Sequence, residues 1–197
     1  MELYIQPVRD VFQTNAYFYI NEKNGHGCLI DPGAQPELLL RIIAERGWQI
    51  DQILLTHGHF DHTGAVAKLV DALNIPYYLH KDGLKYLQDD TLNLAKKYQR
   101  QGNIKVAPTL IATETTLDLA QVNINLQVYF TPGHSFDSIT YYDPTTQIAF
   151  VGDLLYNNGP GIWNFPGGDK QQELRSIQEK LCVLPPAVRC FNGHTIP

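Results

Sequence analysis

The sequence is poor in the residues that mark disulfide-rich, nucleic-acid-binding and membrane proteins. Its 197 residues include three cysteines without a Cys-x-x-Cys pair, so neither a disulfide framework nor a thiolate zinc site is expected. The 15 basic residues are outnumbered by 20 acidic ones, and this balance argues against a basic surface for nucleic acid or anionic lipid. Apolar runs stay short of the roughly 20 residues that span a bilayer. We therefore expect a small-molecule substrate, no nucleic-acid partner and no membrane association.

Residues 1–9 have neither the basic start nor the apolar stretch of a signal peptide, which predicts a cytoplasmic protein. Hydrophobic residues make up 44% of the chain and charged residues 18%, enough for a sizeable core and unlike a disordered chain. No repeat, low-complexity segment or composition shift marks a linker. We predict a single domain over residues 1–197 and leave its oligomeric state open.

Short β-prone segments alternate with amphipathic segments. Strands are expected at 16–20, 27–30, 50–55 and 76–79, helices at 36–46 and 63–73, and helical periodicity continues over 81–101. A strand-rich stretch follows at 109–151, and a last helix is expected at Asp169–Leu181. Alternating strands and helices at both ends, with antiparallel strands between them, predict a layered α/β sandwich.

Four of the expected strands run into a glycine-containing turn and then a side chain that can bind a metal. Ligand sites in layered α/β folds lie in loops just past strand ends, so these turns are expected to meet in one cleft. The side chains are His57, His59, Asp61 and His62 after residues 53–55, His134 after 128–130, Asp153 after 148–151, and His194 after 188–191.

The spacing within this first group of ligands suits two neighbouring ions. Positions i and i+2 of an extended segment project the same way, so His57 and His59 can hold one ion, whereas on a helix they would point apart. If the chain then curls, Asp61 and His62 reach a second ion. The donors are imidazoles and carboxylates, which suit zinc first and also iron or manganese. Such a pair of ions leaves positions open for water, as in a catalytic site.

These motifs resemble the metallo-β-lactamase superfamily, and within it the glyoxalase II (hydroxyacylglutathione hydrolase) branch. The resemblance rests on His57-x-His59-x-Asp61-His62, Thr131-Pro132-Gly133-His134, Gly152-Asp153 and Gly193-His194, with Asp31-Pro32-Gly33 and residues 165–169 in support. It implies a four-layer αββα sandwich with the metals at one edge. It also implies that His57, His59 and His134 hold the first metal, that Asp61, His62 and His194 hold the second, and that Asp153 bridges both.

The resemblance implies a binuclear metallo-hydrolase that cleaves a thioester or ester, with a metal-activated hydroxide attacking the carbonyl carbon. Asp61 and Asp153 are the catalytic candidates, Asp61 because it can supply a proton to a poor leaving group. The alternatives on the same fold are a mononuclear-iron oxygenase acting on persulfides and a hydrolase of a lactone or phosphoester. β-Lactamase activity is not expected without an export signal, and RNA processing is not expected of an acidic chain.

Two departures from the glyoxalase II pattern bear on the substrate. Residues 161–164 read Gly-Ile-Trp-Asn where a charged loop is usual, and no helical domain follows His194, so weak discrimination for glutathione is expected. Because termini fray and His194 is three residues from the end, we expect the natural chain to continue. Candidates for contact with the outer histidine nitrogens are Asp31, Thr56, Ser135 and Ser138. Tyr156, Trp163 and Phe165 are candidates for the cleft wall, and His26 and His80 are expected at the surface. Asp137 follows the loop of His134, and both a role beside the site and a solvated side chain are compatible with the sequence.

Overall fold

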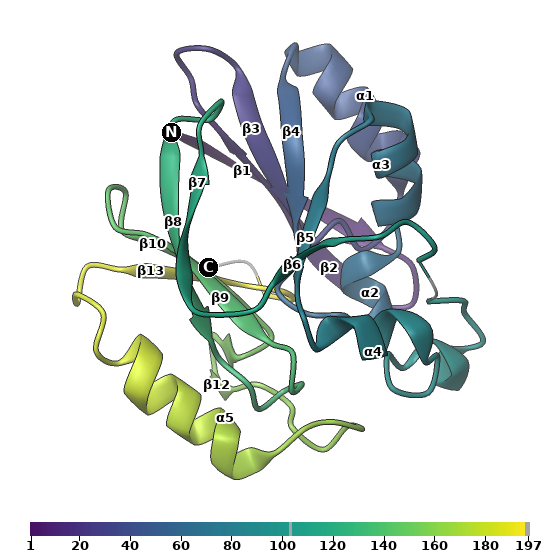
Figure 1. Cartoon of the computed structure of the whole chain (residues 1–197), viewed down its shortest axis with the longest axis vertical. Coiled ribbons are helices and arrows are strands. Elements are labelled where there is room, and N and C mark those ends of the chain that lie inside the picture. The colour runs from purple at the N-terminus through teal and green to yellow at the C-terminus, as the bar shows by residue number, and fades with distance from the viewer. Residues whose placement is uncertain (103, 196–197) are drawn as a thin grey trace.

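Two β-sheets face each other, and helices cover their outer sides (Figure 1). The computed structural model describes residues 1–102 and 104–195. The first sheet has six strands; β1, β2 and β3 are antiparallel, and β3, β4, β5 and β6 are parallel. In spatial order the strands are β1 (Glu2–Arg9), β2 (Gln13–Ile20), β3 (His26–Ile30), β4 (Gln49–Leu54), β5 (Tyr77–His80) and β6 (Thr109–Ile111).

The second sheet has five strands, antiparallel except for the parallel pair β10 and β13. A separate two-stranded ribbon, β11 (Leu155–Tyr156) with β12 (Gly159–Pro160), follows β10. In spatial order the strands of the sheet are β13 (Arg189–Asn192), β10 (Ile148–Gly152), β9 (Ile139–Asp143), β8 (Ile124–Phe130) and β7 (Thr115–Leu119).

Alternation along the strands explains the layers, because successive side chains point to opposite faces of a sheet. In β2, Phe18 packs outward against the helices of the first sheet, and Tyr17 and Tyr19 pack inward against the second sheet. In the second sheet, Phe150 points inward and Val151 points outward. Three apolar layers therefore separate four structural layers, and the predicted αββα sandwich is confirmed.

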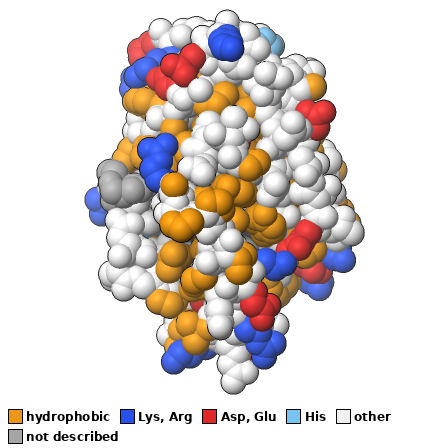
Figure 2. All heavy atoms as spheres, turned by 90° about the vertical axis from the view of Figure 1, so that its left-hand side faces the viewer, with side chains coloured by type: hydrophobic (Ala, Val, Ile, Leu, Met, Phe, Trp, Pro, Cys, Tyr) orange, Lys and Arg blue, Asp and Glu red, His pale blue; other side chains and the backbone are white. Residues whose placement is uncertain are grey.

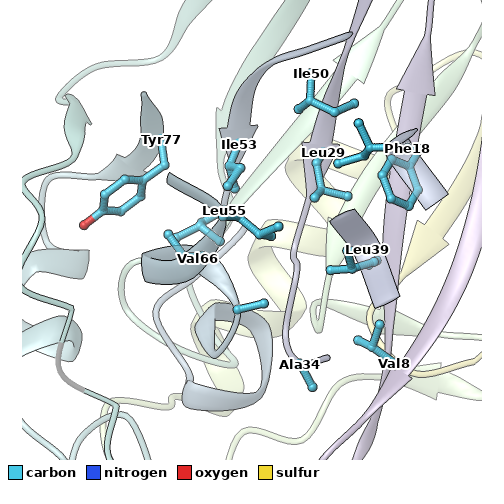
Figure 3. Close-up of a cluster of buried hydrophobic side chains, with 14 of the residues drawn as sticks. Val8, Phe18, Leu29, Ala34, Leu39, Ile50, Ile53, Leu55, Val66 and Tyr77 are labelled. Carbon is cyan, nitrogen blue, oxygen red and sulfur yellow. The ribbon is translucent and has the colours of Figure 1, made fainter. Parts of the chain in front are cut away.

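Helices α1 (Pro36–Arg46) and α3 (Val66–Leu73) cover the outer face of the first sheet. Figure 3 shows Leu39 and Val66 of these helices beside Phe18, Leu29 and Ile53 of the strands. On the other side, α5 (Lys170–Ser176) and its π-helical continuation η2 (Ile177–Leu181) cover part of the second sheet. Hydrophobic side chains show at the surface in the middle of this side, and charges of both signs lie around them (Figure 2).

The continuous helical pattern predicted over 81–101 is wrong. This stretch holds two short pieces, α4 (Gly83–Gln88) and a 3₁₀ turn, η1 (Ala95–Tyr98), while α2 (Phe60–Thr63) is one further short helix. Asp89 ends α4 by accepting hydrogen bonds from the backbone amides of Thr91 and Leu92. Leu94 and Gln99 then adopt positive φ angles of 70° and 57° on either side of η1, a conformation that stops a helix.

No helix of the described residues is long and apolar enough to cross a membrane. Strand β1 was not predicted. It contains Pro7 and lies at the sheet edge, where a missing amide donor is tolerated. Of the three cysteines, Cys28 is buried and Cys182 is exposed.

Candidate metal centre

The end of β4 delivers the first group of candidate ligands. After Leu54 the chain bends at Thr56, is extended at His59 (φ −66°, ψ 146°) and then turns into α2, which carries Asp61 and His62. Gly58 allows this path, since a Cβ there would come within 2.4 Å of the Tyr86 Cβ. The extended segment brings His57 and His59 to the same side, as the spacing predicted, and the helical turn then presents Asp61 and His62 to a neighbouring position.

His57, His59 and His134 form the first ligand set, with their ligand atoms within 4.8 Å of one another. The Nδ1 atom of His59 lies 3.0 Å from His57 Nε2 and 2.9 Å from His134 Nε2. A neutral imidazole carries one proton, so three converging ring nitrogens cannot all be paired by hydrogen bonds among themselves. A cation at their centre would accept all three lone pairs.

The first ligand set is neutral. Burial holds the pKa of His57 and that of His59 well below the usual range, and the charges of neighbouring histidines lower both further. Burial also lowers the pKa of His134. Neutral imidazole is the form that binds a metal, so these three side chains need to lose no proton at neutral pH.

Asp61, His62 and His194 form the second ligand set, also within 4.8 Å. Asp153, at the end of β10, lies between the two sets. Its Oδ2 is 2.9 Å from His194 Nε2 and 3.6 Å from His134 Nε2, and its Oδ1 is 3.3 Å from His62 Nε2. This placement suits the bridging role that the resemblance implies for Asp153.

The second ligand set is held by ion pairs. Burial alone would lower the pKa of His194, but the Asp153 carboxylate raises it to about 9. The same carboxylate, with that of Asp31, outweighs burial and raises the pKa of His62 well above its usual range. Burial in turn favours neutral Asp153, but the charges of His194 and His62 win and hold its pKa well below the usual range.

In four of the candidate ligand histidines, the ring nitrogen that faces away from the centre donates to an acceptor. Three of these acceptors lie close to the centre, and the fourth, the partner of His194, lies on β2. Asp31 Oδ2 accepts from His62 Nδ1 at 3.0 Å and from Thr56 Oγ1 at 2.6 Å. Because the Thr56 hydroxyl proton is used in this way, Thr56 Oγ1 accepts from His57 Nδ1 at 3.1 Å. His134 Nδ1 donates to the carbonyl of Ile162 at 2.6 Å. These bonds fix the tautomers so that Nε2 of each ring faces the centre.

His194 is held by the opposite end of the chain. Its Nδ1 donates to the carbonyl of Gln13 at 2.7 Å. The neighbouring Asn15 amide donates to Gly193 O at 2.7 Å, and the Asn15 side chain donates to Asn192 O at 3.2 Å. Strand β2 thus positions the ligand that follows β13.

The seven predicted ligands therefore meet at one place, and their donor atoms fit divalent metal ions. Within the described residues, His62 Nε2 and Asp153 Oδ1 are buried and form an ion pair at 3.3 Å, but neither atom makes a hydrogen bond, as expected of atoms that face a cation. Imidazole and carboxylate donors suit zinc, iron and manganese.

Other sequence expectations are met in part. Asp31 and Thr56 contact ligand histidines, as expected, but Ser135 and Ser138 do not. The two serine hydroxyls lie 2.6 Å apart, and Ser135 donates to Asp137 at 2.7 Å. Asp137 is fully buried rather than at the surface, and burial raises its pKa to about 7. His80 is likewise buried against Phe130, with ring centroids 4.3 Å apart. His26 is partly exposed and pairs with Asp51 at 3.0 Å.

A cavity of about 340 Å³ opens above the ligands. Tyr156 and Phe165 line it, as predicted, whereas Trp163 does not. Sequence analysis missed the opposite wall, which comes from the β1–β2 turn and from η1, because no local pattern links these segments to the metal-binding turns. Glu173 was not predicted either. It is buried under the loop of His134, and this burial raises its pKa to about 8. The lining residues are Phe12, His59, Asp61, Leu94, Tyr98, His134, Asp153, Tyr156, Asn158, Ile162, Phe165, His194 and Thr195.

Known proteins of related sequence match almost the whole chain. A probable metallo-hydrolase of Bacillus subtilis, YqgX, is 36% identical over 92% of this chain and 85% of its own length. The hydroxyacylglutathione hydrolase GloC of Haemophilus influenzae is 28% identical over 98% of this chain and 91% of its own length.

Solved structures share the fold. The BLEG-1 B3 metallo-β-lactamase superposes with a TM-score of 0.93 at 32% identity, covering 99% of this chain and 92% of that one. TTHA1623, solved in a di-iron-bound form, superposes with a TM-score of 0.84 at 35% identity, covering 97% and 92%. The sequence profile of the metallo-β-lactamase superfamily matches residues 9–194. With the fold, the His and Asp cluster and these matches together, the chain belongs to the metallo-β-lactamase superfamily.

Proposed function

We propose that this protein is a binuclear metallo-hydrolase that cleaves a small thioester or ester, with zinc as its first-choice metal. One observation carries the proposal: two ligand sets meet at Asp153 on the floor of a cavity large enough for a small substrate. The hydroxyacylglutathione hydrolase activity named for a relative with 28% identity supports the thioester assignment.

When bound, two divalent ions would bring the pKa of a water between them toward neutrality and polarise the substrate carbonyl. The chain's own residues do the rest. Asp61 lines the cavity and is placed to pass a proton to a poor leaving group. Tyr156 also lines the cavity; its hydroxyl donates to Asp153 Oδ2 at 2.8 Å and fixes the orientation of that carboxylate.

The reaction consumes one water for each bond cleaved. The water oxygen joins the acyl carbon, the carbon–sulfur or carbon–oxygen bond breaks, and the leaving group takes the bonding electron pair. A thiol with a pKa of about 8.5 leaves readily as the thiolate, so a thioester needs little help from Asp61, whereas an alcohol needs a proton.

The test is to reload metal-free protein with zinc or iron and to assay thioester, ester and chromogenic cephalosporin hydrolysis at each metal content. We expect two ions per chain, thioester turnover that needs metal, and loss of that turnover on chelation. His57→Ala should abolish turnover, whereas His26→Ala, which removes a histidine outside the centre, should not. Turnover that resists chelators would contradict the proposal, and saturation at one iron with oxygen consumption would favour the persulfide oxygenase.

A further inference from the structure

We propose that the part of the substrate that enters the cleft is uncharged and apolar, which makes the substrate class thioesters or esters of apolar acyl groups. This inference rests on the proposed hydrolase function and adds the chemistry that the cleft selects. It departs from the polar acyl group and charged carrier of a hydroxyacylglutathione.

The cleft wall belongs to an apolar cluster that is separate from the three layers of the fold. Phe60, Leu94 and Ala95 form its buried centre, and Tyr98 and Phe165 pack against it. Leu94, Tyr98 and Phe165 also line the cavity, so the open side of this cluster is the wall. Apolar surface that is not covered by the protein gains free energy when an apolar ligand covers it.

Aromatic rings extend this wall down to the ligand histidines. The ring centroid of Phe12 lies 4.9 Å from that of Tyr98 and 6.5 Å from that of His194. On the same wall, the Phe165 centroid lies 6.1 Å from that of His59 and 5.8 Å from that of His134. A group next to the scissile carbonyl would therefore meet aromatic rings.

Two large apolar side chains that are exposed to solvent lie at this wall. Phe12 is 37% exposed and Ile162 is 49% exposed, and both line the cavity. Leu94 adopts a positive φ of 70°, unusual for a branched side chain, and its side chain is nevertheless buried at the wall. Strain of this kind persists where the surroundings hold it in place, often at ligand sites.

Away from the candidate metal ligands, the described residues of the lining offer no positive partner to a charged substrate. Among its described residues the charged side chains are the candidate ligands, and neither lysine nor arginine contributes. Lys97 lies over the rings of Tyr98 and Phe165, at 5.3 and 5.7 Å from their centroids, but it is exposed and does not line the cavity. Arg100 is paired with Asp10 at 2.6 Å. A carboxylate placed against these walls would lose its hydration without gaining a partner.

The test compares acetyl, butyryl and succinyl thioesters of one neutral thiol. Butyryl and succinyl groups differ only in a terminal methyl or carboxylate. Two added methylenes should raise kcat/KM from acetyl to butyryl by about fifteenfold. The carboxylate should lower kcat/KM of the succinyl ester by about a hundredfold relative to butyryl. Equal rates, or a preference for succinyl, would overturn the inference and leave the hydrolase function intact.

Two arginine variants localise the selectivity. Ile162→Arg places a cation at the cleft and keeps the backbone carbonyl that accepts from His134. It should reduce the preference for butyryl over succinyl by at least about tenfold. Val183→Arg adds the same charge at a residue that is 70% exposed and does not line the cavity, and it should leave the preference unchanged. Identical ratios in both variants would contradict the assignment of the wall.

A binding measurement separates this inference from the proposed function. Benzylacetone is a ketone that the protein cannot hydrolyse, and its para-carboxylate differs by one charge. Saturation-transfer NMR on the metal-free protein measures this. Benzylacetone should give a binding signal with the wild type and none with Ile162→Arg. The para-carboxylate should give no binding signal with the wild type. If no ester is hydrolysed at any metal content, the function fails, and this measurement still decides the inference. Equal binding of both ketones would refute it.

Discussion

The two ligand sets differ in charge although they share Asp153. In the first set, buried neutral imidazoles converge, and a cation between them would accept the lone pairs of all three nitrogens. In the second set, His62 and His194 are paired with carboxylates, and their pKa values are raised. An ion entering the first set meets vacant lone pairs, whereas an ion entering the second must displace protons. We infer that the first set binds more tightly and that pH controls the second.

The largest effect is expected from removing the residue that the two sets share. Asp153→Ala takes a ligand from each set and removes the negative charge that offsets repulsion between two dications. It should lose both ions and reduce turnover by about a thousandfold or more. His57→Ala should weaken the first ion and His62→Ala the second. Metal analysis of each variant checks this.

A matched control distinguishes metal binding from folding. Asp143 is also buried, and it ends β9 in the same sheet that carries Asp153. Its carboxylate accepts a hydrogen bond from the Tyr19 hydroxyl of the facing sheet at 2.5 Å. Asp143→Ala should lower thermal stability yet keep both ions. Two tightly bound ions in Asp153→Ala would mean that Asp153 merely stabilises its turn.

The second prediction is that pH separates the sets. The pKa of His194 is raised to about 9, so below that pH an incoming ion must displace its proton. The pKa of His62 is raised as well, so affinity of the second set should rise by at least about tenfold, and by up to about a hundredfold, per pH unit between pH 6 and 8. The pKa values of His57 and His59 are lowered, so affinity of the first set should change little over this range. Calorimetric zinc titrations at several pH values measure both, and equal slopes would remove the distinction.

The third prediction concerns Asp31, which serves both sets. An asparagine can adopt its φ of 50° but offers one acceptor oxygen where the carboxylate takes hydrogen bonds on two. Asp31→Asn should weaken both ions by about 10- to 100-fold. Asp51→Asn, which alters a carboxylate paired with His26 away from the centre, is the control. If only the second ion weakens, Thr56 does not relay the effect to His57.

The smallest effect is expected for Tyr156. Tyr156→Phe removes one hydrogen bond to Asp153 Oδ2 and leaves every ligand in place. Metal content should stay at two ions per chain. We expect kcat to fall by about fivefold, which corresponds to the roughly 1 kcal/mol that one hydrogen bond contributes. Tyr129→Phe, which removes a hydroxyl bonded to Gln127 outside the centre, should leave kcat unchanged. A loss of metal in Tyr156→Phe would mean that Asp153 depends on this contact for its position.

The metal centre could be located from the sequence because the patterns that mark its ligands are local. The i, i+2 spacing of His57 and His59 depends on an extended backbone, and the strand pattern before residue 56 supplies it. The alternation that sends Phe18 and Tyr19 to opposite faces is local too, and it predicted a layered fold. The division of the seven candidate ligands into two sets with a shared Asp153 came from the resemblance, and the geometry suits this division.

The parts that were missed depend on distant contacts. That His59 presents Nδ1 rather than Nε2 follows from packing and not from spacing. The cleft wall joins Phe12 to Leu94 and Phe165, which lie far apart in the sequence. The stretch 81–101 has helical periodicity, but the turn at Asp89 and the positive φ of Leu94 break it. Distant contacts form the cleft wall, whereas the break in 81–101 is a local turn that helical periodicity does not reveal.

The hydrogen bonds between β2 and the loop of His194 also determine the order in which the two ligand sets form during synthesis. The ligands of the first set and Asp153 precede the last strand in the chain, so they are synthesised before it. The second set waits for residue 194, which must cross the molecule to reach the Gln13 carbonyl 181 positions earlier in the chain. Closing so long a loop is slow, so an emerging chain assembles the first ligand set before the second.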